Sequence, residues 1–377
     1  MYAATGAWAS FVYLLGPSTP QLAEDFELDP RQAGLYGTAL ALGIVAGGSV
    51  SGPATARLGR LLSFRLGLLL LLCGVGTLVV SATYLVSLVA VWVGGVGGAL
   101  VLNTSTATLS QIHPDDSAAA IAEANALAAW VGAASPLVLG AALAAGIGWR
   151  GGVALCLALV GGALLASTLA RGSTAAASPE PQRSVESAPG LLNSRFVATC
   201  VALFAATGAE FAVTFWGASL LRELTSPAGA AASMSAVVIG LAVGRTVGAR
   251  LSMRLDTHWL LVGGFAAAAL GFGTFWTGPV LTIAVLGLFL TGLGLSILFP
   301  FILARVIDNS AGEPDRGLGV ASLVLGSAIA IAPFLLGALA SLIPVRTAFL
   351  LVPVLLGVGA LAVLRSRPSS STLTAIT

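Results

Sequence analysis

The sequence contains no lysine and has little charge of either sign. Its 17 basic residues are all arginine, and together with 15 acidic residues they make up only 8% of the 377 positions. A soluble domain carries about 25% charged residues, because its surface must face water. Without lysine the chain has no P-loop, whose lysine reaches the β and γ phosphates, and no Schiff-base chemistry. This absence argues against a nucleotide-driven pump within this chain.

Cysteine and histidine are scarce as well. Cys73, Cys156 and Cys200 lie singly inside apolar segments, and His113 and His258 stand at predicted helix ends far apart in the sequence. None of these residues has the neighbours that a metal site needs. We therefore expect no metal ion and no other cofactor. The sequence also lacks a basic run interleaved with aromatic residues, which argues against a nucleic-acid partner.

Hydrophobic length is what the sequence has in abundance. Hydrophobic residues make up 57% of the chain, and many apolar runs reach the roughly 20 residues with which a helix crosses a bilayer. We predict an all-α polytopic membrane protein with twelve transmembrane helices in two pseudo-symmetric six-helix bundles. The predicted spans are residues 3–20, 33–54, 62–82, 84–109, 118–145, 150–171, 195–218, 231–252, 258–277, 279–303, 317–342 and 345–365.

A polar stretch divides these spans into two sets of six. Residues 172–194 are rich in Ser, Ala, Pro and charge, which is typical of a disordered linker. We expect an N-terminal bundle over residues 1–171, a C-terminal bundle over 195–365 and a tail over 366–377. Most arginines fall on the side of the linker and both termini, which indicates that this side is cytoplasmic. We expect a monomer in the plasma membrane.

The two sets of spans also repeat each other. An offset of 197 residues maps spans 2, 4 and 5 onto spans 8, 10 and 11. The matched pairs are Gly43 with Gly240, Gly47 with Gly244, Arg57 with Arg254, Leu58 with Leu255, Gly95 with Gly292, Gly97 with Gly294, Pro136 with Pro333 and Gly140 with Gly337. Such a duplication is typical of parallel repeats related by an axis along the membrane normal.

Several segments resemble the major facilitator superfamily. They are residues 15–26 (LGPSTPQLAEDF) with 32–34 (QAG), 52–60 (GPATARLGR), 148–150 (GWR), and 244–248 (GRTVG) followed by Arg254. The resemblance covers nearly the whole chain and implies a secondary transporter that works by alternating access. Residues 52–60 resemble the signature loop between helices 2 and 3 of that family. This likeness implies a cytoplasmic gate formed by Gly52, Arg57, Gly59, Arg60, Arg245 and Arg254.

The chain departs from the family pattern at three positions. Ala56 stands where the signature loop normally carries Asp, and Val91 stands where drug–proton antiporters carry an arginine in helix 4. Ser135 precedes Pro136 where antiporters usually show Gly. These differences argue against a drug-antiport mechanism and indicate an altered charge network around the signature loop.

Glu210 is the predicted proton-coupling residue. It lies well inside the seventh span, where an acid is costly and therefore marks a functional site by default. Desolvation favours its neutral form, so it can take up a proton at one stage of a cycle and release it at another. The alternative is a glutamate that bonds to a neighbouring helix purely for packing.

Arg245 is the one arginine well inside a span. Helix geometry places it roughly 10 Å nearer the cytoplasm than Glu210, so we do not expect a direct ion pair between them. We interpret it as a gate residue that binds helix ends or a carboxylate, in preference to a substrate contact.

The wall of the predicted substrate cavity consists of polar and aromatic residues near the bilayer midplane, where such transporters bind their substrates. The candidates are Tyr13, Asn103, Thr106, Asn125, Trp130, Trp216 and Phe299. We predict a proton-coupled carrier of a small organic solute, with a multidrug or metabolite efflux carrier as the alternative. A receptor or scaffold that keeps the fold without transport is an alternative of another class. An intramembrane enzyme is disfavoured, because the spans contain no paired carboxylates and no HExxH.

Overall fold

The computed structural model describes residues 1–112, 116–169, 193–252, 254–310 and 313–366. Within these ranges every regular element is a helix. Hydrocarbon offers peptide groups no water to bond with, so a segment that crosses a bilayer must satisfy its own backbone, as a helix does. The predicted all-α class is confirmed.

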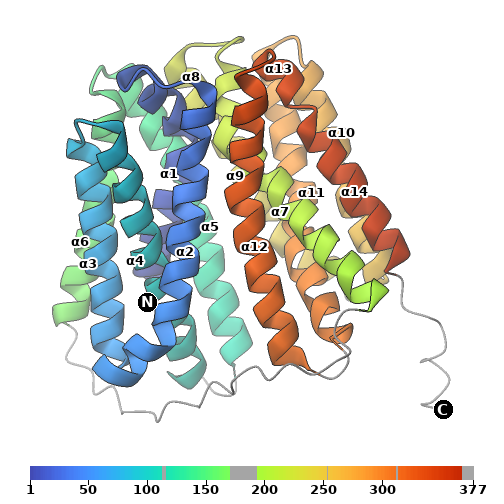
Figure 1. Ribbon diagram of the computed structural model, residues 1–377, viewed down its shortest axis with the longest axis horizontal. Helices are drawn as coiled ribbons and strands as arrows, with labels where there is room; N and C mark the ends of the chain where they lie inside the picture. Colours follow the sequence, from blue (N-terminus) through green and yellow to red (C-terminus); the bar gives the residue numbers. More distant parts are fainter. Residues whose placement is uncertain (113–115, 170–192, 253, 311–312, 367–377) are drawn as a thin grey trace.

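The first half of the chain forms six helices that alternate in direction (Figure 1). They are α1 (Tyr2–Asp25), α2 (Pro30–Leu58), α3 (Arg60–Val80), α4 (Tyr84–Ile112), α5 (Ser117–Ala144) and α6 (Gly148–Leu169). Helices α2 to α6 are long and apolar enough to cross a membrane. With 24 residues α1 has a similar length, but its second half carries prolines and acidic residues.

The second half repeats this arrangement with two interruptions. Its helices are α7 (Ser194–Leu221), α8 (Pro227–Ser233), α9 (Ser235–Leu251), α10 (Thr257–Thr277), α11 (Leu281–Asp308), α12 (Pro314–Ala340), α13 (Val345–Ala348) and α14 (Leu351–Arg365). Helices α8 and α9 together form one span, and so do α13 and α14. The described helices therefore match the twelve predicted spans in order.

Two faces of the bundle are used below as landmarks. The linker face is the one at which α6 ends and α7 begins, at the bottom of Figure 1. The opposite face is the one at which α1 ends and α2 begins. The predicted linker and tail lie outside the described residues apart from Asn193, Ser194 and Ser366.

Local sequence explains where several helices begin. The Asp29 side chain accepts a hydrogen bond from the backbone N–H of Gln32, and the Gln32 side chain accepts one from the N–H of Asp29. This capping box satisfies N–H groups that the first turn of α2 would otherwise leave unpaired. Asn193 and Asp256 likewise accept backbone N–H groups at the starts of α7 and α10.

Helices within each half approach backbone to backbone at glycines. A Cβ atom on Gly43 of α2 would overlap the carbonyl oxygen of Trp92 on α4, and one on Gly240 of α9 would overlap that of Phe289 on α11. Both members of the second contact lie 197 positions after those of the first. The contact between the second and fourth helices of the first half therefore recurs at equivalent positions in the second half. Small residues of this kind let helices pack closely in membranes.

The halves meet along three seams, which are α2 against α12, α5 against α8 and α9, and α1 against α7. The first seam runs down the front of Figure 1, where α2 and α12 stand side by side. Toward the opposite face this seam is tight. The hydroxyl of Thr38 donates to the carbonyl oxygen of Ala330 at 2.8 Å, and a Cβ atom on Gly337 would overlap the carbonyl oxygen of Pro30.

The other two seams are closed in the same way. A Cβ atom on Gly140 of α5 would lie 2.7 Å from the carbonyl oxygen of Ala228 on α8. One on Gly16 of α1 would overlap the carbonyl oxygen of Thr214 on α7. Since Gly140 and Gly337 are equivalent positions of the repeat, the seams on both sides of the bundle follow the same pseudo-symmetry.

We expect Gly43→Ala to destabilise the fold, because the added methyl group would meet backbone that cannot rotate away. Overpacking of this kind costs about 1–3 kcal/mol, so the midpoint of thermal unfolding in detergent should fall by several degrees. The control is Gly48→Ala in the same helix, where nothing lies within 4 Å of the added atom. Its midpoint should stay level or rise, because alanine favours a helix over glycine. Equal effects of the two changes would contradict the packing argument.

Candidate functional site

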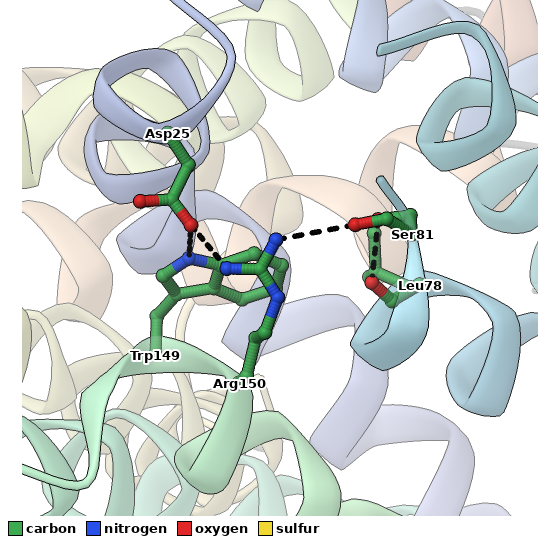
Figure 2. A network of polar contacts seen from close by, with 5 residues as sticks. All are labelled: Asp25, Leu78, Ser81, Trp149 and Arg150. Atoms are coloured by element: carbon green, nitrogen blue, oxygen red, sulfur yellow. Dashed lines mark hydrogen bonds and ion pairs between the residues drawn. The ribbon is translucent and has the colours of Figure 1, made fainter. Parts of the chain in front are cut away.

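A network of polar contacts ties together the ends of α1, α3 and α6 on the opposite face (Figure 2). Arg150 forms an ion pair with Asp25 and donates to the carbonyl oxygen of Ser81 at 3.2 Å. The indole N–H of Trp149 donates to the same carboxylate at 2.7 Å, and the guanidinium of Arg150 lies 4.5 Å from the centre of a Trp149 ring. These contacts hold three helix ends of the first half together as one unit.

Two further ion pairs continue this pattern across the opposite face. Arg346 pairs with Glu223 at 3.3 Å within the second half. Arg222, at the end of α7, pairs with Glu24, at the end of α1. Because Glu24 is adjacent to Asp25 and Arg222 to Glu223, the three pairs follow one another across the bundle. The Glu24–Arg222 pair joins the two halves, and we call it the crossing pair.

Three polar side chains from three helices meet inside the bundle, and we call them the central cluster. The hydroxyl of Tyr13 on α1 interacts electrostatically with the guanidinium of Arg245 on α9 and with the carboxyl group of Glu210 on α7. Glu210 and Arg245 also attract each other. In the described part of the chain they do not form a direct ion pair, which agrees with their different depths.

The central cluster lies away from the helix ends, and its side chains are not fully buried. Tyr13 and Glu210 are half-buried and Arg245 is exposed, although Arg245 reaches α1 of the other half. The Tyr13 ring packs against Gly132 of α5, where a Cβ atom would lie 2.5 Å from the ring. The cluster therefore joins side chains of both halves, with Tyr13 from the first and Glu210 and Arg245 from the second.

The repeat explains why two of these residues meet. Glu210 lies 197 positions after Tyr13, so the two occupy equivalent places in the first helix of each half. Arg245 is different, because its equivalent in the first half is Gly48, which has open space around it. The positive charge of Arg245 therefore has no equivalent in the first half.

Phe299 and Asn125 extend this region toward the linker face. Phe299 is 37% exposed and lies one turn beyond Ser296, which packs against Gly244 of α9. Asn125 is exposed and lies seven residues before Gly132, so both are on the same face of α5. That face of α5 meets α1, where Gly132 packs against Tyr13.

The structure does not bring three other candidates to the cluster. Trp130 is 54% exposed and precedes Gly132 by two residues, which places it about 200° around α5 from the face that meets α1. Asn103 is exposed and Thr106 is half-buried, both on the part of α4 nearer the linker face. No contact joins them to Tyr13, Glu210 or Arg245 in the described part of the chain.

Trp216 is buried, and its indole N–H donates to the carbonyl oxygen of Pro333 at 2.9 Å. The contact gives Trp216 a role in packing α7 against α12 within the second half.

The residues assigned to a cytoplasmic gate lie around the α2–α3 junction, with the exception of Arg245 and Arg254. Arg60 donates to the carbonyl oxygen of Ala107 at 3.3 Å and bonds to the side chain of Gln111, both on α4. Gly59, with a φ of 80°, makes the turn into α3. The remaining members are Arg57 and Arg254, which are exposed, and Gly52, which is half-buried. Arg60 thus bonds within its own half, whereas Arg245 interacts with Tyr13 of the other half.

The crossing pair and the role of Arg150 were not predicted from the sequence. A signal was present, since each half has an acid at the end of its first span and an arginine at the start of its sixth. The equivalence of Tyr13 and Glu210 was not predicted either, because the two residues are of different types and do not stand out as a repeated pair at the offset of 197.

A family model described as the Major Facilitator Superfamily matches residues 2–223 and 196–375. No curated protein matches the sequence significantly. Among solved structures, the fold is similar to the inward-open xylose transporter XylE from E. coli, with a TM-score of 0.78 and 13% identity, covering 97% of this chain and 94% of that one.

Two further solved transporters share the fold. A point variant of the nucleoside transporter NupG gives a TM-score of 0.77 at 13% identity, covering 97% of this chain and 98% of that one. A bacterial homologue of the human lysosomal transporter Spinster, inward-facing and occupied, gives 0.75 at 14% identity, covering 98% of this chain and 97% of that one. At these identities the likeness concerns the fold.

We expect Arg222→Ala to favour opening of the opposite face, because it removes the crossing pair. A solvent-exposed ion pair contributes about 0.2–1 kcal/mol, so the open population should rise by up to about fivefold. Spin labels at Ala82 and Val280, which are exposed on that face in different halves, would report this as a longer distance in a cysteine-free background. The control, Glu223→Ala, breaks a pair within one half and should leave the distance unchanged. The same lengthening in both variants would contradict the role given to the crossing pair.

Proposed function

Because the chain belongs to the major facilitator superfamily, we propose that it carries a small organic solute across the membrane by alternating access, coupled to a proton through Glu210. The observation that supports this most directly is the central cluster. It sets an acid inside a membrane span, where the two halves meet, and links it to Tyr13 of the other half. An acid in that position is costly and is retained where ions or protons move.

The seams support movement of the halves as two units. Within each half, helix backbones touch at glycines, and polar networks tie helix ends together. Between the halves, small residues and the crossing pair make the contact at the opposite face. Such an interface can separate without unfolding either half. Two of the similar solved structures are inward-open and inward-facing, which fits a state closed at the opposite face.

The charges of the cluster suggest how a proton enters the cycle. An ionised Glu210 partly neutralises Arg245, and protonation of Glu210 removes that attraction. An uncompensated charge is costly at low dielectric. A proton on Glu210 therefore changes how the site binds a solute, which is the requirement for coupling.

Orientation follows from the arginines. On the linker face or at the helix ends nearest to it lie Arg57, Arg60, Arg65, Arg195, Arg250, Arg254, Arg305, Arg316 and Arg365. On the opposite face lie Arg31, Arg150, Arg222 and Arg346. Positive residues in short loops are retained in the cytoplasm, so we propose that the linker face is cytoplasmic and that the protein resides in the plasma membrane.

We expect Glu210→Gln to separate exchange from coupling. The variant cannot release a proton, so proteoliposomes should retain counterflow of a solute found by thermal-shift screening but lose its accumulation against a gradient when a pH difference is imposed. The control is Glu123→Gln, which removes an exposed acid that bonds to Tyr2, and which should accumulate solute normally.

Three outcomes decide among the alternatives. Accumulation by Glu210→Gln at the wild-type level would exclude the coupling role. A solute that binds the wild-type protein but never crosses would indicate a receptor or scaffold. Solute export driven by an inward proton gradient would identify an efflux carrier.

A further inference from the structure

We propose that the central cluster binds a small monoanionic solute, with its carboxylate held by the guanidinium of Arg245 and the hydroxyl of Tyr13. The part of this inference that links binding to a proton rests on the proposed function. The site itself rests on the position, partners and charge of Arg245.

Arg245 is available to a ligand. Its side chain is exposed, and within the described residues it takes part in none of the ion pairs. At the equivalent position in α2, a Cβ atom added to Gly48 would have nothing within 4 Å. The first half therefore packs with no side chain at the position equivalent to Arg245. Helix packing does not explain why the second half has an arginine there.

The groups around Arg245 suit a carboxylate. A guanidinium presents its N–H groups as a planar fork that matches the two oxygens of a carboxylate. Tyr13 places a hydroxyl beside this fork from the other half. Phe299, 37% exposed one turn beyond the packing contact with α9, offers an apolar surface for the body of the solute.

Few other charges can influence the site. Of the titratable and charged groups on helices packed against α7, Tyr13 and Arg245 are the ones that interact with Glu210 in the described part of the chain. The other charged residues of those helices whose side chains the structure describes stand toward helix ends, and they are Glu24, Asp25, Arg31, Arg57, Arg250, Arg305, Asp308, Arg316, Arg346 and Arg365.

Charge balance then selects the solute. With Glu210 ionised, it and Arg245 sum to zero, and with Glu210 protonated the cluster carries one positive charge. Opposite charges attract each other more strongly where water is partly excluded, and Tyr13 and Glu210 are half-buried beside the exposed Arg245. One monoanion restores neutrality, whereas a neutral solute leaves the charge in place and a cation doubles it. The proton and the anion therefore bind together.

The binding test compares carboxylates with their own amides, which match them in shape and lack the charge. The probes are acetate and acetamide, lactate and lactamide, and benzoate and benzamide, each added to the full chain in detergent during thermal unfolding. At least one carboxylate should raise the midpoint at acidic pH while its amide does not. A panel in which no carboxylate exceeds its amide overturns the proposal.

Variants assign that effect to the cluster. Arg245→Gln should abolish the stabilisation, and Arg250→Gln, the same change at an exposed position of the same helix, should keep it. Tyr13→Phe should weaken binding about 2–10-fold, the loss of one hydrogen bond. Size-exclusion profiles and unliganded midpoints near the wild-type values show that each variant is folded. Retained stabilisation in Arg245→Gln overturns the site.

The pH dependence gives a readout that a structural role would not change. In the wild-type protein the affinity for the carboxylate should fall by up to about tenfold per pH unit once Glu210 ionises. In Glu210→Gln the affinity should stay at its acidic value throughout. The same slope in both proteins overturns the link between proton and anion.

The two proposals fail in different ways. If carboxylates bind through Arg245 but do not enter proteoliposomes, the binding site stands and transport fails. If neutral solutes accumulate and Arg245→Gln still accumulates them, transport stands and the anion site fails.

Discussion

The close approach of helix backbones at glycine is the contact on which the rest of the structure depends. In a bilayer, lipid tails are as apolar as the side chains, so helices associate through tight packing instead of through release from water. Equivalent glycines such as Gly43 and Gly240 make the same contact in each half. Each half is thereby packed through glycine contacts between its spans. Its polar residues can therefore lie at the interface between the two halves.

Polar residues are accordingly concentrated in two layers. At the opposite face, Asp25, Arg150 and their counterparts in the second half join helix ends where water can reach them. Deep in the bundle, Tyr13, Glu210 and Arg245 meet where the halves face each other. The outer layer holds each half in shape and lightly joins the two. The inner layer is where the proposed protonation of Glu210 changes the charge between them.

Sequence predicted the number of spans, their order and the repeat, because hydrophobic length and glycine spacing are properties of the chain itself. It also singled out Glu210, since depth alone makes an acid conspicuous. It could not give the partners of Arg245, because a long side chain crosses the difference in depth and the position of α1 decides what it meets. Nor could it place Trp130 and Asn103, because spans that are apolar all round do not reveal which face turns inward.

Both charged members of the central cluster belong to the second half, and Tyr13 alone belongs to the first. In the proposed transport cycle, the attraction between Glu210 and Arg245 stays within one half when the halves part. What separates is a contact with an uncharged hydroxyl, worth about 0.5–1.5 kcal/mol, or up to about 3 kcal/mol with a charged partner. Because both charged residues belong to the same half, the proposed movement of the pseudo-twofold bundle does not separate them.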